Sequence, residues 1–269
     1  GLVEYSDEMV AGTYECSVHY IRDNYVYVLL RNVTELEHAK NELEVKNKEL
    51  NQMAYLVSHD LKAPLRTISS FITLLNDRHT EQFSEEALKL FAYISTATER
   101  MVNLVTDILD YSIVGKGKKL SEVDTAKLIR EVQEDLSVII QESNTTFEVI
   151  QDLPVLTGYE TELRMLFQNI INNAIKFRKK NTAPVIKIYA EKKNGWTFFI
   201  QDNGIGIDEE YQGKIFDVFQ RLHSKSDYEG TGIGLSHCKK IVDLHNGKIG
   251  VVSKPNEGST FHFSIPDSL

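Results

Sequence analysis

The sequence predicts a multidomain protein in which an α-helical hairpin, forming a dimeric four-helix bundle, precedes an α/β sandwich. Residues 33–114 have the pattern of two helices, with apolar residues at helical spacing on both sides of a loop. Residues 120–269 mix helical segments with short runs of β-forming residues. The basic stretch 115–119 lies between these parts, and its glycines predict a flexible linker.

Composition narrows the class of function. The chain has 269 residues and a net charge of −9, which argues against nucleic acid as the main partner. Its two cysteines lie far apart and are expected to be reduced thiols. No signal peptide and no apolar run of membrane-spanning length is present. We therefore expect this fragment to be cytoplasmic, while the full-length protein could be cytoplasmic or membrane-anchored.

The N-terminal part predicts a β-hairpin followed by a coiled coil. Residues 14–21 and 25–31 are rich in β-formers and flank the turn signal Asp23-Asn24. One hairpin is too small for a domain, so it reads as the end of a larger sheet. From residue 33 the chain shows two companion positions repeating every seven residues, at Leu36, Leu43, Leu50 and Val57, and at Val33, Lys40, Asn47 and Ala54. This pattern favours a dimer, the alternative being a long helix packed within one chain.

The remaining elements follow from periodicity and turn signals. The first long helix is expected to reach about residue 75, a loop to cover 76–82, and the second helix to cover about 84–114. Further helices are expected near 124–142, 159–178 and 234–245, and strands near 146–150, 185–191, 197–201, 247–253 and 259–265.

His59 is the first candidate functional residue. The helical phase places it on the side opposite a stripe that is expected to be buried, made of Val57, Leu61, Leu65, Ile68 and Ile72. Pro64 cannot donate to the carbonyl of Asp60, so a kink is expected beside the histidine. Asp60 could polarise the imidazole and make it a nucleophile near neutral pH. Alone, such a pair is usually a solvated surface feature.

Three polar or glycine-rich segments suggest a phosphate ligand. Asn169, Asn173 and Lys176 share one face of a helix, and amide oxygens suit a partly hydrated Mg²⁺. Asp202 ends a strand before Gly204 and Gly206, where it could accept a hydrogen bond from the amine of adenine. A third segment precedes a helix, whose N–H groups could bind phosphate, and comprises Gly230, Thr231, Gly232, Gly234 and Leu235.

The third segment has the glycine spacing of a dinucleotide fingerprint, but it follows no strand and opens no βαβ unit. A dinucleotide-binding fold is therefore rejected. Between Gly206 and Gly230 the sequence predicts a mobile lid, with Phe216 and Phe219 as apolar anchors and a polar stretch at 224–229. A plain surface loop with two core phenylalanines is the alternative.

In this order and at these distances, the segments resemble those of sensor histidine kinases of two-component systems, over roughly residues 50–269. His59 is similar to the phosphoacceptor box, residues 169–177 to the asparagine box, 202–207 and 230–235 to the glycine boxes, and 216–219 to the phenylalanine box. Residues 219–242 look like kinases of the phytochrome-related type.

The resemblance implies a homodimer that uses ATP and Mg²⁺ and phosphorylates a response regulator receiver domain. It implies four parts: the last strands of a PAS-like sensor domain (1–32), a signalling coiled coil (33–53), a dimerisation and histidine phosphotransfer domain (54–115), and a Bergerat-fold ATP-binding domain (120–269).

The resemblance also assigns roles. His59 accepts phosphate and Asp60 is its base. Asn173 and Asn169 hold Mg²⁺, and Lys176 and Arg178 contact phosphate. Asp202 reads the adenine amine, while the pocket and lid are shaped by Gly204, Gly206, Gly230, Thr231, Gly232, Gly234 and Leu235.

One residue departs from the family pattern. Many relatives have Thr or Asn four residues after the histidine, where it orients water for dephosphorylation of the regulator, and this chain has Ala63. We therefore expect a kinase with weak phosphatase activity. The alternatives are an ATP-binding dimer that transfers nothing, or an ATPase or chaperone of the same sandwich superfamily. The second is disfavoured because those proteins usually have a catalytic Glu where this chain has Asn169.

Overall fold

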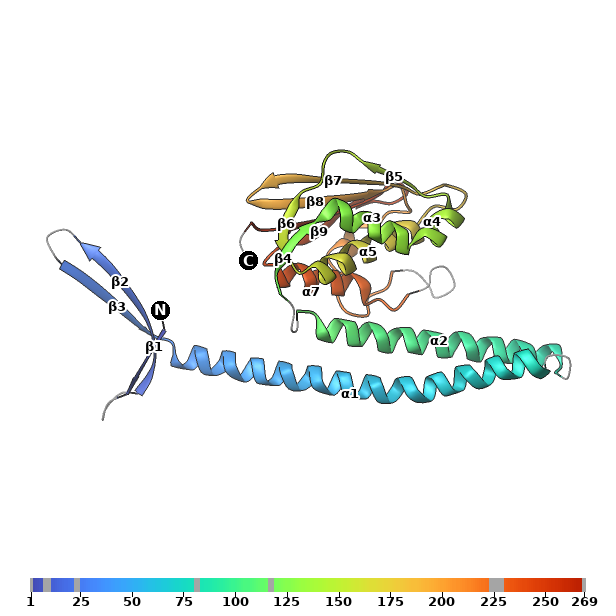
Figure 1. Ribbon diagram of the computed structural model, residues 1–269, viewed down its shortest axis with the longest axis horizontal. Helices are drawn as coiled ribbons and strands as arrows, with labels where there is room; N and C mark the ends of the chain where they lie inside the picture. The colour runs from blue at the N-terminus through green and yellow to red at the C-terminus, as the bar shows by residue number, and fades with distance from the viewer. Residues whose placement is uncertain are drawn as a thin grey trace. The chain divides into compact units, whose positions relative to one another are not determined.

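The computed structural model describes residues 2–6, 11–21, 25–79, 83–115, 119–222 and 230–267 (Figure 1). The chain divides into two compact units, one up to Val57 and one from Ser58 onward. Both the predicted helical hairpin and the α/β domain that follows it are confirmed. Among the described residues, no helix is both long and apolar enough to cross a membrane.

The first unit begins with a three-stranded antiparallel sheet of order β1-β2-β3, formed by β1 (Leu2–Ser6), β2 (Ala11–Ile21) and β3 (Tyr25–Asn32). β1 was not predicted. The start of the following helix is tied to this sheet, because the N–H of Val33 donates to the carbonyl of Thr13 at 2.9 Å. The N–H of Thr13 in turn donates to Oγ1 of Thr34 at 2.9 Å. The helix therefore leaves the sheet in a fixed direction.

The two long helices are α1 (Thr34–His79) and α2 (Glu85–Ile113). Residues 76–79, predicted as loop, are helical because neither Gly nor Pro interrupts them. The rest of that predicted loop, 80–82, lies outside the described residues. α2 begins where the Ser84 hydroxyl accepts the N–H of Ala87 at 3.2 Å, a side-chain cap that satisfies one of the open donors of the first turn.

The buried stripe expected around His59 is only partly correct. Leu65 and Ile72 are buried, but Val57, Leu61 and Ile68 are 57%, 47% and 41% exposed. Within one chain a helical hairpin covers a single face of each helix, and the residues buried there recur every seven positions: Ser58, Leu65 and Ile72 on α1, and Thr98, Val105 and Ser112 on α2. The exposed apolar residues lie on other faces.

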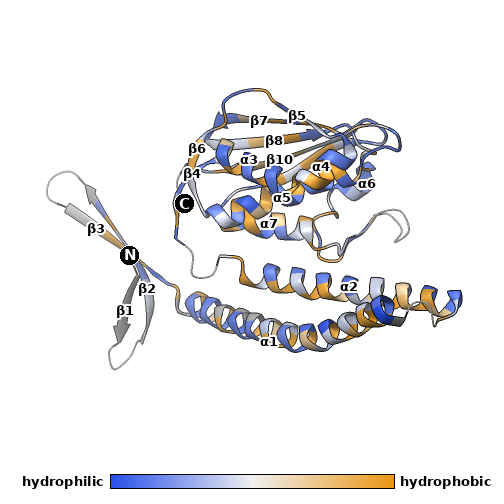
Figure 2. Ribbon diagram, turned by 45° about the vertical axis from the view of Figure 1, so that its right-hand side comes forward, coloured by the Kyte–Doolittle hydropathy of each residue, from blue (hydrophilic) through white to orange (hydrophobic). Residues whose placement is uncertain are grey.

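The α/β part has a five-stranded sheet of order β5-β7-β8-β10-β9 with helices on one side (Figures 1 and 2). Its strands are β5 (Thr146–Val149), β7 (Val185–Lys193), β8 (Gly195–Asp202), β9 (Ile249–Lys254) and β10 (Gly258–Ile265). All neighbouring strands are antiparallel except β5 and β7. The covering helices are α3 (Thr125–Asp135), α4 (Ser137–Ser143), α5 (Glu160–Lys176) and α7 (Gly234–Leu244).

Sequence patterns missed the smallest elements. β4 (Ser121–Asp124) and β6 (Val155–Gly158) form a separate two-stranded sheet, and α6 (Glu209–Gln212) is a single turn. Each has four residues, too few for a periodic pattern. The helix expected at 124–142 is two helices, α3 and α4, which meet at Leu136.

The core lies between the sheet and α5. Phe167 of α5 packs edge-on against Phe198 and Phe263, with ring centroids 5.4 and 5.3 Å apart, and all three side chains are fully buried. Such aromatic burial is a large apolar contribution to folding and fixes α5 on the sheet. The opposite face of α5 is polar, and it is the face that carries the predicted site residues.

Candidate functional site

The asparagine segment lies on α5. Asn169 and Asn173 are four residues apart and half-buried, and Lys176 follows in the last turn. Fully buried neighbours such as Leu166 and Ile170 face the core and fix the rotation of the helix. The two amides and the ammonium are therefore displayed together on the face of α5 that points away from the sheet.

The second glycine segment lies directly against this face. A methyl group at Gly234 would lie 3.0 Å from Oδ1 of Asn169, and one at Gly230 would lie 2.6 Å from Nζ of Lys176. Glycine at these positions therefore allows backbone to approach the amide and the ammonium closely. Gly234 also opens α7, whose first N–H groups have no partner within the helix and suit an anion.

Asp202 ends β8 and is only 8% exposed. Its Oδ1 accepts the N–H of Gly204 at 2.8 Å and that of Ser259 at 3.2 Å. Burial raises the pKa of this carboxyl to about 6, and the two backbone donors oppose the increase. Both backbone bonds go to Oδ1, so Oδ2 is the oxygen that an outside donor would reach. Sequence reasoning missed Ser259, because the β8–β10 register brings it to Asp202 from far along the chain.

The first glycine segment is tied to the end of α5. The N–H of Ile205 donates to the carbonyl of Phe177 at 3.0 Å, and a methyl group at Gly204 would lie 2.6 Å from that oxygen. Gly206 has φ +73° and lies against the carbonyl of Lys254. A side chain would be strained there. Asp202 is thereby held beside the helix that carries the asparagines.

The predicted lid is only partly correct. Phe216 is buried, but Phe219 is 58% exposed, so it is not an apolar anchor. Its backbone adopts φ +64°, and its N–H donates to the carbonyl of Gly232 at 3.1 Å. This backbone contact turns the ring outward and links the phenylalanine segment to the second glycine segment. The polar stretch 224–229 lies outside the described residues.

His59 and Asp60 lie on α1 with side chains that are 75% and 83% exposed. Nδ1 of His59 is 3.2 Å from Oδ1 of Asp60. The outward position predicted from the helical phase is therefore confirmed. If Asp60 accepts a hydrogen bond from a protonated Nδ1, the neutral imidazole has its lone pair on Nε2, the ring nitrogen that does not contact the carboxylate.

Three other predicted residues have partners that the sequence did not suggest. The Arg178 guanidinium donates to the carbonyl of Ile175 at 3.2 Å. The hydroxyl of Thr231 donates to Asp107 on α2. Leu235 packs against the hydrophobic core of the α/β domain. Nothing in the sequence indicated that Asp107 contacts Thr231, because Asp107 is one of several acidic residues on an amphipathic helix.

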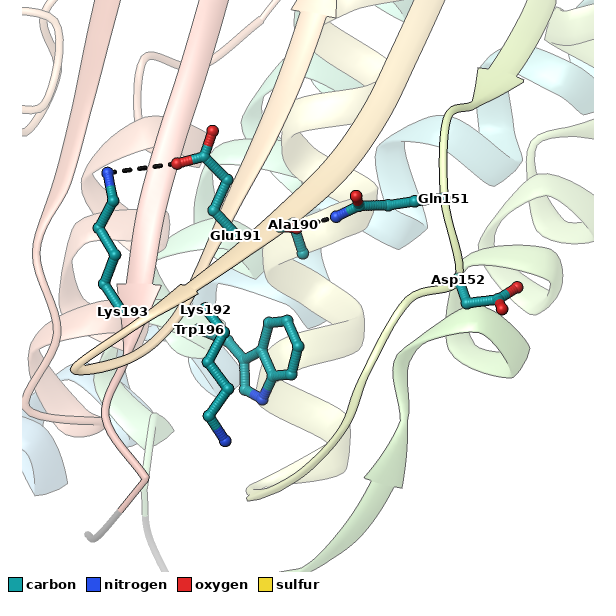
Figure 3. A pocket seen from close by; sticks show the side chains of 7 residues that line it. All are labelled: Gln151, Asp152, Ala190, Glu191, Lys192, Lys193 and Trp196. Atoms are coloured by element: carbon teal, nitrogen blue, oxygen red, sulfur yellow. Dashed lines mark hydrogen bonds and ion pairs between the residues drawn. The ribbon is translucent and has the colours of Figure 1, made fainter.

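A shallow depression of about 600 Å³ lies elsewhere, at the β7–β8 turn (Figure 3). Trp196 is one of the residues that line it, with Nζ of Lys192 5.2 Å from the centre of the indole ring, and the side chain of Gln151 donates to the carbonyl of Ala190. Trp196 and Asp202 are at opposite ends of β8, ~20 Å apart for an extended strand. This depression contains none of the predicted site residues.

Two family descriptions match the chain. Residues 49–117 match the His Kinase A phospho-acceptor domain, and residues 158–269 match the histidine kinase-, DNA gyrase B- and HSP90-like ATPase. His59 lies in the first match. All the predicted asparagine and glycine-segment residues lie in the second, which makes this part an ATP-binding domain.

Among curated proteins, the phytochrome-like protein Cph1 of Synechocystis sp. is 39% identical over 90% of this chain and 32% of its own length. Cyanobacterial phytochrome A of Nostoc sp. is 39% identical over 91% of this chain and 32% of its own. The chain thus spans about a third of the length of these relatives.

Solved structures agree with this assignment. Full-length ShkA in complex with AMPPNP shares the fold, with TM-score 0.63 and 24% identity over 81% of this chain and 46% of its own. Histidine kinase ThkA in complex with the response regulator protein TrrA has TM-score 0.57 and 26% identity over 99% of this chain and 78% of its own. With an exposed histidine in a phospho-acceptor domain joined to an ATPase domain of matching type, the chain belongs to the sensor histidine kinase family.

Proposed function

We propose that this chain binds ATP, transfers the γ-phosphoryl group to Nε2 of its own His59, and relays it to an aspartate of a response regulator. The observation that supports this most directly is the exposed His59–Asp60 pair within the phospho-acceptor match, in a chain that also has an ATP-binding domain. Phosphoryl transfer needs positioning and charge neutralisation more than covalent chemistry by the protein.

The ATP-binding domain supplies the positioning. Oδ2 of Asp202 accepts a hydrogen bond from the exocyclic amine of adenine. Lys176 and the first N–H groups of α7 contact the phosphates, because a point charge and a helix N-terminus both favour an anion. Arg178 lies two residues beyond Lys176 and would reach phosphate only by exchanging its bond to Ile175.

The donor set suits magnesium bound jointly with phosphate. Asn169 and Asn173 offer neutral amide oxygens, and Oδ1 of Asn169 faces the backbone at Gly234. Among the described residues, no group of three or more His, Cys, Asp or Glu side chains could hold a metal ion by itself. Mg²⁺ prefers such mixed coordination with water and phosphate oxygens, and when bound it would neutralise triphosphate charge.

The histidine supplies the nucleophile. Asp60 holds the proton on Nδ1, and the Nε2 lone pair attacks the γ-phosphorus. The new N–P bond forms as the bond from phosphorus to the β,γ-bridging oxygen breaks, and ADP leaves with that electron pair. In the second step the phosphoryl group passes from Nε2 to the regulator's aspartate, which restores the imidazole.

We also propose that the chain acts as a homodimer with a PAS-like input domain. Leu36, Leu43 and Leu50 recur every seven residues on α1 and are 62%, 68% and 68% exposed. A coiled coil with a second copy would cover them. The sheet β1–β3 exposes Val28, Leu29 and Leu30, consistent with the end of a larger sensor domain.

Labelling with γ-³²P-ATP tests the proposal. The wild-type chain should acquire acid-labile, alkali-stable label, and His59→Gln should acquire none. His38→Gln is the matched control, since His38 is an exposed histidine on the same helix and should leave labelling unchanged. A wild type that binds ATP without becoming labelled would show an ATP-binding scaffold instead of a kinase.

A further inference from the structure

The segment that follows α5 is attached at both ends to the first glycine segment. At its start, the carbonyl of Phe177 accepts the N–H of Ile205 at 3.0 Å. At its end, the side chain of Asn203 makes two hydrogen bonds. Its Oδ1 accepts the N–H of Val185 at 2.9 Å, and its Nδ2 donates to the carbonyl of Ala183 at 3.0 Å. The chain between these attachments is therefore fixed relative to the glycine segment.

The two bonds from Asn203 continue the pairing of β7 with β8 where backbone pairing ends. The pair at this end of the ladder is Ile186 with Asp202, and Pro184 lies two residues before Ile186. Proline has no N–H to donate, so the backbone alone cannot carry the pairing through this position. The amide of Asn203 instead donates to the residue before Pro184 and accepts from the residue after it, because an amide has both a donor and an acceptor.

The chain between the two attachments is a turn that begins with three basic residues, Arg178, Lys179 and Lys180. It closes where the N–H of Thr182 donates to the carbonyl of Lys179 at 3.3 Å. We call residues 178–182 the basic turn. Arg178 and Lys180 are exposed, whereas Lys179 is half-buried. Lys179 is therefore the basic residue of the turn that lies most closely against the protein.

Lys179 acts on the carboxyl group of Asp202. Burial raises the pKa of Asp202, whereas two backbone N–H donors and the positive charge of Lys179 oppose the increase. A nearby cation favours the ionised form, which is the form that accepts a hydrogen bond from an amine. The position of the basic turn therefore affects how much of this carboxyl is ionised near neutral pH.

The elements around Asp202 carry other lysines, which have contacts of their own. Lys187 on β7 and Lys254 on β9 are each paired with a glutamate, at 2.9 and 3.5 Å. Nζ of Lys176, at the end of α5, lies 4.5 Å from the centre of an aromatic ring. Of these lysines and Lys179, it is Lys179 whose charge lowers the pKa of Asp202 against the effect of burial.

We propose that Asn203 is a positioning residue for nucleotide binding, which holds the basic turn so that the positive charge of Lys179 favours the ionised carboxylate of Asp202. The proposal rests on the proposed function, because it takes Asp202 as the group that binds the adenine amine. Asn203 acts without touching the nucleotide, since Oδ1 and Nδ2 of its side chain are both bonded to backbone. Its effect reaches the ligand through Lys179 and Asp202.

The test is the affinity of the chain for adenosine, measured by competition against a fluorescent nucleotide at two pH values. Asn203→Ala loses both bonds to the end of the basic turn. At about pH 8, where the carboxyl of Asp202 is ionised with or without the turn in place, it should bind adenosine as the wild type does. At about pH 5.5 it should bind about twofold more weakly than the wild type, because less of the carboxyl is then ionised.

Variants of Lys179 test the same effect without changing Asn203. Lys179→Met keeps the length of the side chain and loses the charge, so it should reproduce the loss of affinity at about pH 5.5. Lys179→Arg keeps the charge and should bind as the wild type does. Lys180→Met is the matched control, because it removes a charge from the exposed neighbour in the same turn and should have no effect. In the Lys179→Met background, Asn203→Ala should cause little further loss at about pH 5.5.

Two results would overturn the positioning role. One is an equal loss of affinity at both pH values in Asn203→Ala, which would make Asn203 a structural residue only. The other is a Lys179→Met variant that binds adenosine as the wild type does at about pH 5.5, and this measurement decides the proposal if Asn203→Ala does not fold. Labelling of His59 tests the kinase function separately. A chain that binds adenosine but is not labelled would overturn the kinase function and leave the positioning role to the binding measurements.

Discussion

At the scale of single residues, Asp202 shows how burial changes the pKa of a carboxyl group that we propose binds adenine. Removal from water favours its neutral form, while the N–H groups of Gly204 and Ser259 favour the carboxylate. Burial dominates, and the pKa of about 6 leaves the group mostly ionised at neutral pH. It can then accept a hydrogen bond from an amine near neutral pH and loses much of this ability in mild acid.

Binding of adenosine, which has no phosphate, should therefore weaken as pH falls. From about pH 7.5 to about pH 5.5 the ionised fraction of a group with this pKa drops about fourfold, and the affinity should drop by a similar factor. Competition against a fluorescent nucleotide measures this, and Asp202→Asn should bind weakly at both pH values. A wild-type affinity independent of pH would contradict the assigned role.

The same shift has the opposite sign for folding. Because the folded state holds this proton more tightly than the unfolded state, its contribution to the free energy of unfolding is fully present below pH 3.8. That contribution is lost as pH rises through about 6. The stabilising contribution of Asp202 is thus lost in the pH range where we propose that its carboxylate binds adenine.

Ala63 lies one turn after His59, exposed and without a polar side chain. Ala63→Thr should therefore increase dephosphorylation of the phosphorylated regulator in the presence of ADP, on the order of tenfold, because a hydroxyl there can orient water. Release of phosphate from the purified regulator measures the effect. Ala92→Thr adds the same hydroxyl at an exposed site on α2 and should have no effect. Rapid dephosphorylation by the wild type would refute the expectation of weak phosphatase activity.

At the scale of elements, α5 and the start of α7 approach each other closely, and we propose that nucleotide binds there. The aromatic core fixes α5 on the sheet, and the glycines let backbone come within contact of its polar side chains. This close approach of the backbone to Asn169 and Lys176 depends on the absence of side chains at Gly230 and Gly234.

Gly234→Ala should weaken ATP binding severalfold with little loss of stability. The methyl group would press on Oδ1 of Asn169 at 3.0 Å, while alanine itself favours the helix by ~1 kcal/mol. Gly213→Ala is the matched control, because no atom lies within 4 Å of a methyl group there and the backbone is right-handed. Calorimetric titration and thermal unfolding of both variants separate affinity from stability. Equal affinities would show that Asn169 does not require this approach.

At the scale of the whole molecule, the long helix α1 leaves apolar surface that one chain does not cover. Leu43 and Leu50 on α1 are each 68% exposed, and Val57 and Leu61 extend the exposed apolar surface past His59. Burial of such residues stabilises by roughly 1.5–3 kcal/mol each, which favours association with a second copy.

Leu43→Lys combined with Leu50→Lys should shift the chain from dimer toward monomer at micromolar concentration. Sedimentation velocity measures the distribution. Val45→Lys introduces the same charge at a residue that is 57% exposed but outside both repeating positions, so it should leave the dimer intact. An unchanged dimer in the double variant would place the interface elsewhere.

Local periodicity was sufficient for much of the fold and the site. Helical phase placed His59 outward and set Asn169 and Asn173 on one face, and both features depend only on residues within a few turns. Helical phase failed for Val57, whose exposure depends on what a single hairpin can cover. The expectation that Phe219 anchors a lid failed for another reason, because a left-handed backbone conformation turns its side chain out. Local periodicity also failed for the short strands β4 and β6, since each is stabilised by its partner.

By itself, the sequence determined the order of the motifs, the outward position of His59 and the family to which the chain belongs. Only the tertiary structure decided which distant groups meet. Ser259 reaches Asp202 through the pairing of β8 with β10, and Thr231 reaches Asp107 across 124 positions. Such contacts depend on how packed elements align in space, and the residues that make them have no periodicity or spacing in common.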